Sequence, residues 1–164
     1  MATSHSQDRC ASLTTKMKKR FSLMALLLLA MLTAFGNDVC QKCDIYKVKL
    51  IHENIDSLTL EIVEDFLCTL DRSCINNVEF SEWSNETIFT ILINAPALFF
   101  QVMDKGKINS VLILSEIETP IHDLIDLQKV YNNVKAVSTE TELKNNVLKS
   151  VIKAASNINE EIKR

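Results

Sequence analysis

Four of the five cysteines lie close together, as Cys40-x2-Cys43 and Cys68-x5-Cys74. Thiols at these spacings could form disulfides, hold a zinc ion or act as a redox pair. A redox pair needs a helix amino end after a strand to lower the thiol pKa, and no strand is predicted before Cys40. Oxidation competes with zinc binding outside the cytosol. We therefore predict two structural disulfides, without a metal or a cofactor.

The predicted disulfide pairing follows from the geometry of a helix pair. Cys43 and Cys68 lie about equally far from a predicted turn near Asn54, so two antiparallel helices would bring them level. Crossed pairing would offset two sulfur atoms by about 12 Å, at roughly 1.5 Å per helical residue, which exceeds the reach of a disulfide. We therefore predict the nested pairing, Cys43 with Cys68 and Cys40 with Cys74.

Few other residues have types and spacings that suit catalysis. Past residue 36 the chain has one glycine, Gly106, which excludes phosphate-binding loops, dinucleotide fingerprints and nucleophile elbows. The two histidines of that region are His52 and His122. His122 with Asp126 could form an acid–base or metal-binding pair on one helix face, but such residues are more often a solvated first turn. We predict a protein that is not an enzyme.

Residues 17–36 have the layout of a secretory signal peptide, with a basic cluster, an uncharged apolar run over 21–35, and small residues at Ala34 and Gly36. We predict that residues 1–36 are removed, with Met17 as an alternative start, and that 37–164 form one secreted domain. An uncleaved anchor is the alternative, although the apolar run is shorter than the about 20 residues that span a bilayer. Both alternatives place the domain outside the cytosol.

The surface charge of the exported chain argues against some partners. Residues 37–164 contain 13 basic and 20 acidic residues, a net charge of −7. Nucleic acids and anionic membranes attract basic surfaces, so we predict neither as a partner, with membrane contact only through an uncleaved leader. Asn85-Glu86-Thr87 is the one N-x-S/T sequon. It predicts a glycan at an exposed Asn85.

The scarcity of glycine indicates helices, because β-rich domains need many glycine-containing turns. Apolar residues recur at three- and four-residue intervals along most of the chain. We predict an all-α, small disulfide-stapled bundle of about five or six helices. The expected segments are 44–52, where a strand is the alternative, 57–71, 88–103, 108–117, which suits a helix or a strand equally, 119–134, and 139–162.

Residues 88–103 contain no charged side chain, which is typical of a buried central helix. Pro96 should kink this helix or divide it in two. Ser84 is the predicted N-cap, and Gly106 should end the segment with a left-handed conformation. Because the segment is central, we expect Leu92 and Phe99 to be buried.

The last two predicted helices begin with capping signals. Thr119 and Pro120 suit the N-cap and first position of one helix. Thr139 with Glu142 fits a capping box at the start of the other.

These features favour a binding function. We predict a secreted, non-enzymatic interaction protein that binds an extracellular or cell-surface protein through a helical face, with Lys144, Lys149 and Lys153 as outward-facing candidates. The alternative is an extracellular carrier of a lipid or other apolar ligand. Its pocket would be lined by Phe89, Phe99, Phe100 and Met103.

Overall fold

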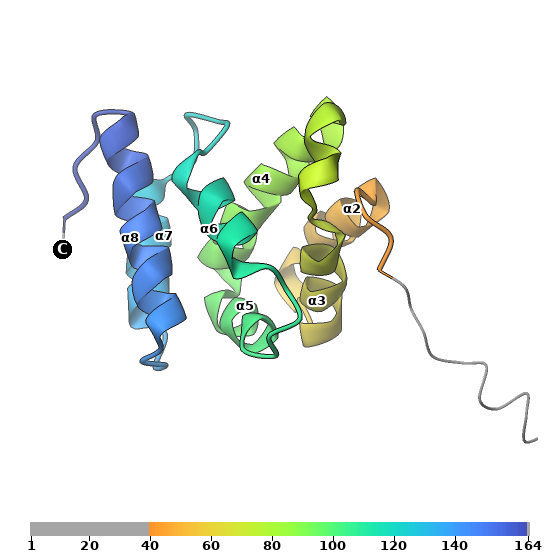
Figure 1. The fold of residues 1–164 in the computed structure, drawn as a ribbon. Coiled ribbons are helices and arrows are strands. Elements are labelled where there is room, and N and C mark those ends of the chain that lie inside the picture. The colour runs from red at the N-terminus through yellow and green to blue at the C-terminus, as the bar shows by residue number, and fades with distance from the viewer. Residues whose placement is uncertain (1–39, 164) are drawn as a thin grey trace, which may run out of the picture. The chain divides into compact units, whose positions relative to one another are not determined.

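The computed structural model describes residues 40–163, whose regular elements are all helical. Figure 1 shows the arrangement of these helices, with α2 and α3 on one side, α7 and α8 on the other, and α4, α5 and α6 between them. The described residues form seven α-helices and two short 3-10 helices, without a strand. The all-α prediction is confirmed. The predicted leader and its cleavage site lie outside the described residues.

Two short helices open the described chain, α2 (Ile45–Glu53) and α3 (Leu60–Thr69). Each has a side-chain N-cap, since Asp44 accepts the N–H of Tyr46 and Thr59 accepts that of Ile62. The first segment is therefore the predicted helix, not a strand. The 3-10 helices η1 (Ile55–Ser57) and η2 (Arg72–Asn76) follow α2 and α3, respectively.

The uncharged central segment is divided at Pro96, as predicted. Helix α4 (Val78–Asn94) and helix α5 (Pro96–Met103) meet at 112°. The predicted N-cap at Ser84 is wrong, because α4 begins six residues earlier and Asn77 caps it by accepting the N–H of Phe80. Ser84 instead lies buried within α4, where its hydroxyl donates to the carbonyl of Ser81.

The second half of the domain contains α6 (Ser110–Glu118), α7 (Leu127–Ala136) and α8 (Glu142–Asn157). Gly106 precedes α6 with φ +69°, the predicted left-handed conformation. Residues 108–117, for which the sequence suited a helix or a strand equally, lie largely in α6. Packing decides this, because Ile113 and Ile117 lie four residues apart and are both buried.

Both predicted caps in this half are wrong. Thr119 and Pro120 lie in a loop, and α7 begins after Asp126, whose carboxylate accepts the N–H of Lys129. The loop cannot continue as a helix because Asn85 binds the N–H of Ile121 and the carbonyl of Thr119. Helix α8 is capped by Thr141, two residues after the predicted position.

The core runs through the middle of the bundle and is rich in phenylalanine. Every α-helix contributes to it, but α4 and α5 supply most of the large side chains. Helix α8 packs its buried residues against α6 and α7. One face of α6 is therefore buried in the core and the other is exposed. The exposed face lies near η2 and the start of α4.

Candidate functional site

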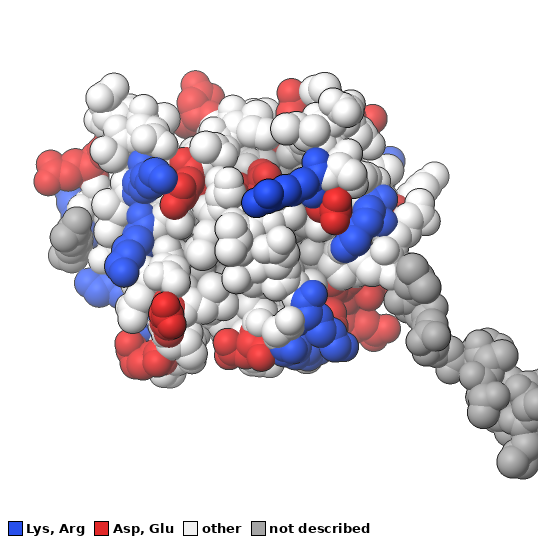
Figure 2. Space-filling view, in the orientation of Figure 1, with Lys and Arg blue, Asp and Glu red and all other residues white. Residues whose placement is uncertain are grey.

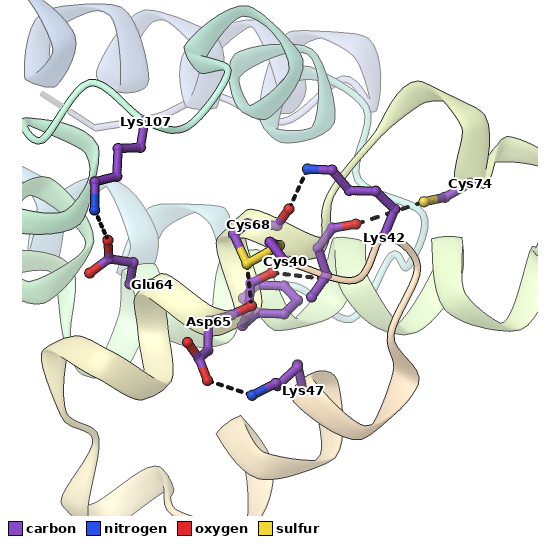
Figure 3. The surroundings of a disulfide bond; sticks show 10 residues. Cys40, Lys42, Lys47, Glu64, Asp65, Cys68, Cys74 and Lys107 are labelled. Atoms are coloured by element: carbon purple, nitrogen blue, oxygen red, sulfur yellow. Dashed lines mark hydrogen bonds and ion pairs between the residues drawn. A yellow bond between two sulfur atoms is a disulfide. The ribbon is translucent and has the colours of Figure 1, made fainter. Parts of the chain in front are cut away.

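The four cysteines form two disulfides at the start of the domain. Cys40 is bonded to Cys68 and Cys43 to Cys74, with Cα–Cα distances of 5.9 and 5.5 Å. The prediction of two disulfides is confirmed, but the predicted nested pairing is wrong. Figure 3 shows the Cys40–Cys68 bond beside α3, with Cys74 on a separate segment.

The pairing differs because the cysteines do not lie on two continuous helices. Helix α2 begins only at Ile45, and Cys43 adopts φ +57° in the turn before it. At the other end α3 stops at Thr69, and η2 carries Cys74 on a new path. The N–H of Cys43 donates to the carbonyl of Thr69 at 2.9 Å. This bond holds Cys43 beside the last residue of α3, past Cys68 and close to Cys74. The estimate from the rise per helical residue does not apply there, because neither Cys43 nor Cys74 lies in α2 or α3.

The surroundings of the disulfides are those of a structural cross-link. Lys42 Nζ donates to the carbonyl of Cys68 at 2.7 Å, and Cys74 is only 4% exposed. Further along α3, Glu64 pairs with Lys105 and Lys107. The hydrogen bond from Lys105, helped by Lys107, lowers the pKa of Glu64. Lys47 of α2 pairs with Asp65 of α3 at 2.5 Å, so ion pairs join α3 both to α2 and to the segment before α6 (Figure 3).

Asn85 is a buried structural residue, so the prediction of an exposed glycosylation site is wrong. Its side chain is 0% exposed. Asn85 Nδ2 lies 3.0 Å from both the carbonyl oxygen and Oε2 of Glu116, and Asn85 Oδ1 accepts the N–H of Ile121 at 3.1 Å. A glycan on Nδ2 would have no space and would break these bonds. The sequence around Asn85 does not reveal this burial, because it does not show which face of α4 other helices and loops cover.

The structure places the four residues of the predicted apolar pocket in the core. Phe89, Phe99, Phe100 and Met103 are all at most 5% exposed. The rings of Phe99 and Phe100 pack edge to face, with centroids 5.3 Å apart. Phe100 also borders an open groove of about 630 Å³ beside Pro96 and Asn133. Leu92 and Phe99 are both 0% exposed, as predicted.

The histidines lie apart. His52 Nε2 is 2.9 Å from Thr87 Oγ1, and His122 Nε2 is 4.0 Å from Glu86 Oε2. Asp126, the suggested partner of His122, instead caps α7. Within residues 40–163 no three histidine, cysteine or acidic side chains are grouped as metal ligands.

The three lysines suggested as an outward face differ in exposure. Lys144 is buried, and its ammonium donates to the carbonyl of Val137 at 2.7 Å and to Glu140. Lys153 pairs with Glu118 at 2.6 Å, whereas Lys149 is exposed. The prediction is wrong for Lys144, because its position at the start of α8 lets the side chain bind the end of α7.

A surface groove between η2 and α6 is a stronger candidate for a binding site. This η2–α6 groove has a volume of about 470 Å³. Its lining is mainly apolar and comes from η2, α4, α6 and the loop after α6. The apolar lining residues include Leu70, Ile75, Phe80, Leu112 and Ile121.

Large apolar side chains remain exposed on the segments that form this groove. Ile75 is 77% exposed and Ile121 is 46% exposed. On the same segments Val78, Val111 and Leu124 are 64%, 63% and 91% exposed. Both Ile121 and Leu124 fall in the segment 119–134 that was predicted to be one helix, and they are exposed because this part of it is instead the loop that Asn85 binds. Nothing in the local sequence marked Ile75.

The groove also has a charged edge. Arg72, the first residue of η2, lines it and is exposed. Glu116 lines the opposite side, where Asn85 binds its carboxylate. Figure 2 shows that the middle of the face over α6 carries few charged side chains, with basic and acidic groups gathered around it.

The described helices give no clear membrane-spanning segment. No single helix between residues 40 and 163 has the length and hydropathy needed to cross a bilayer. Helices α4 and α5 reach that length and hydropathy only when the two are taken together, and the pair is bent by 112°. Most of their large apolar residues belong to the core.

No protein-family model, characterised protein sequence or solved structure matches this chain.

Proposed function

We propose that this chain is a secreted helical interaction protein that binds a protein partner at the η2–α6 groove. The observation that carries the proposal is the apolar groove with Ile75 and Ile121 exposed beside it. Exposed apolar side chains are common singly, but a group of them around a concave surface is typical of an interaction site. The neighbouring Val78, Val111 and Leu124 would extend the contact beyond the groove.

Secretion is supported by the two disulfides, because such bonds persist in oxidising compartments and are rare in the cytosol. The signal-peptide pattern of residues 17–36 gives a route to that compartment. We propose that residues 1–36 are removed on export. A binding role, not an enzymatic one, agrees with the separate positions of His52 and His122.

A carrier of an apolar ligand is the second candidate, since a groove of about 470 Å³ falls within the size range of small-molecule sites. A small ligand in the groove would leave the apolar side chains outside it exposed to water. A protein partner would cover them. The exposure of Val111 and Leu124 therefore favours the protein partner.

The test compares binding of labelled protein to the surface of cells from the source organism. Ile75→Asp and Ile121→Asp should each lower the bound fraction by about tenfold or more, because a charge would enter an apolar contact. Ile158→Asp is the matched control, since Ile158 is 40% exposed and lies at the end of α8. Equal loss in all three variants would contradict the groove as the binding site.

Native mass spectrometry of the purified protein tests the carrier. A stoichiometric lipid that is lost in Ile75→Asp, together with absent cell binding, would replace the first proposal by the second. A protein partner predicts an empty groove and a thermal stability that added lipid does not raise.

A further inference from the structure

We infer that the partner segment in the η2–α6 groove is an apolar peptide face that carries a carboxylate, and that this carboxylate pairs with Arg72. The inference rests on the proposed function and specifies the chemistry of the partner. It is carried by the position of Arg72 on the groove, by the absence of a side-chain partner for Arg72 among residues 40–163, and by the apolar surface beside it.

Arg72 is the one arginine among residues 40–163. It is exposed and makes no side-chain hydrogen bond or ion pair with any residue that the structure describes. Several lysines of the domain are occupied, since Lys105 and Lys107 bind Glu64 and Lys153 binds Glu118. Arg72 therefore presents all its donors to a molecule that enters the groove.

The neighbour of Arg72 does not neutralise it. Asp71 accepts the N–H and the hydroxyl of Ser73, at 2.9 and 2.8 Å, and so caps η2. The backbone hydrogen bond from Ser73 is the main cause of a lowered pKa at Asp71, with a smaller contribution from Lys42. Asp71 also lines the groove and keeps its negative charge, but among the described residues the only basic side chain that contributes to its lowered pKa is Lys42, not Arg72.

The opposite wall has the opposite charge. Glu116 of α6 lines the groove and is held by Asn85 Nδ2 at 3.0 Å. Arg72 and Glu116 form no ion pair across the groove. A bound segment therefore meets one cationic group, the Arg72 guanidinium, and two carboxylates, Asp71 and Glu116, so its own carboxylate must lie against Arg72. This polarity would fix the direction in which the segment lies.

An arginine beside apolar side chains suits this role. The planar guanidinium can pair with a carboxylate through two parallel hydrogen bonds, and it is more weakly hydrated than an ammonium group. Covering Ile75 and Ile121 would remove water from the pair and so strengthen it. Arginine is also among the residues enriched at the energetic centres of interfaces.

The test is selection of short helical peptides from a displayed library on the full exported chain with both disulfides intact. We expect the enriched peptides to share apolar residues three or four positions apart, with an acidic residue beside them. Arg72→Glu should weaken these peptides by about tenfold or more, because like charges then face each other. Replacing the acidic residue of a peptide by lysine should restore its binding to Arg72→Glu.

Lys129→Glu provides the matched control. Lys129 is exposed on α7, makes no ion pair within the described part of the chain and does not line the groove. The change alters net charge as Arg72→Glu does, so general electrostatic attraction would respond equally to both. Peptide affinity should change by less than about twofold. Circular dichroism and thermal unfolding of both variants establish that they fold.

The possible failures can be told apart. If Ile75→Asp and Ile121→Asp abolish peptide binding but Arg72→Glu does not, or if Lys129→Glu matches Arg72→Glu, the inferred carboxylate is refuted and the groove remains the binding site. If selected peptides bind all the groove variants equally, the proposed function fails as well. A stoichiometric lipid that competes with the peptides would also overturn both.

Discussion

Asn85 joins parts of the chain that are distant in sequence. It lies in the middle of α4, and its amide contacts the end of α6 and the loop that follows. These bonds fix Ile121 at the edge of the η2–α6 groove. A buried amide whose hydrogen bonds are all made stabilises the fold and also favours one arrangement of the loop, because any displacement leaves buried polar groups without partners.

Replacing Asn85 by alanine should destabilise the domain by about 3 kcal/mol, since the N–H of Ile121 and the carbonyls of the loop would lose buried partners. Chemical denaturation of the two proteins measures the difference. Asn94→Ala is the control. Its amide makes one exposed bond to the carbonyl of Thr90, and the expected cost is below about 1 kcal/mol. Similar costs for both changes would mean that the Asn85 contacts do not hold the loop.

The contribution of Glu64 to the stability of the domain should depend on pH. Its pKa is lowered from 4.5 in the folded state, first by the hydrogen bond from Lys105. A carboxyl group with a lowered folded pKa stabilises the protein above its unfolded pKa, and this contribution is lost as pH falls through the folded pKa. Glu64→Gln should therefore lower the Tm at neutral pH. The difference should begin to shrink as pH falls below about 4.5 and should vanish once pH is below the lowered folded pKa. A constant difference at all pH values would exclude this ion cluster as its cause.

At the scale of elements, the sequence predicted most helices but few of their ends. Periodic apolar residues identified α3 and α8, and the missing charges identified α4 and α5. One predicted helix start failed because a distant contact overrides a local signal, and another failed because a different local cap begins the helix earlier. Pro120 suits a helix start, yet Asn85 holds the loop open. Ser84 suits an N-cap, yet Asn77 begins the helix earlier.

The predicted disulfide pairing was wrong because the pairing depends on the path of the chain outside the helices. Cys43 lies in a left-handed turn and Cys74 in η2. Neither conformation follows from the C-x2-C or C-x5-C spacing.

The two disulfides should differ in their resistance to reduction. Cys40 and Cys68 are both half-buried, whereas the other bond joins half-buried Cys43 to Cys74, which is 4% exposed, and so offers one accessible residue in place of two. The sequence separations of 28 and 31 residues are similar, so loop entropy favours neither bond. A thiol should therefore reach and open Cys40–Cys68 first, because exchange requires access to a sulfur atom. Stepwise reduction, alkylation and peptide mapping measure this order. Early opening of Cys43–Cys74, or peptides that join Cys43 to Cys68, would contradict the structure.

At the scale of the whole molecule, the η2–α6 groove could not be predicted from the sequence. The groove combines residues from η2, α4, α6 and a loop, which are separate in the chain. Sequence analysis predicted a helical binding face with outward lysines on α8, where Lys144 is buried. Exposure depends on how helices pack, and the periodicity of one helix does not show which neighbours cover it.

The mass of the exported protein tests the proposed organisation of the entire chain. We expect an amino terminus at or near Asn37, because Ala34 and Gly36 fit the small-residue pattern of signal-peptide cleavage. The mass should be lower by four hydrogen atoms, for two disulfides. It should also lack a glycan, since Asn85 is 0% exposed. Enzymatic deglycosylation is the control, and it should leave the mass unchanged. A retained leader would contradict the proposed removal of residues 1–36, whereas a glycan on Asn85 in folded protein would contradict the packing of α4 against α6.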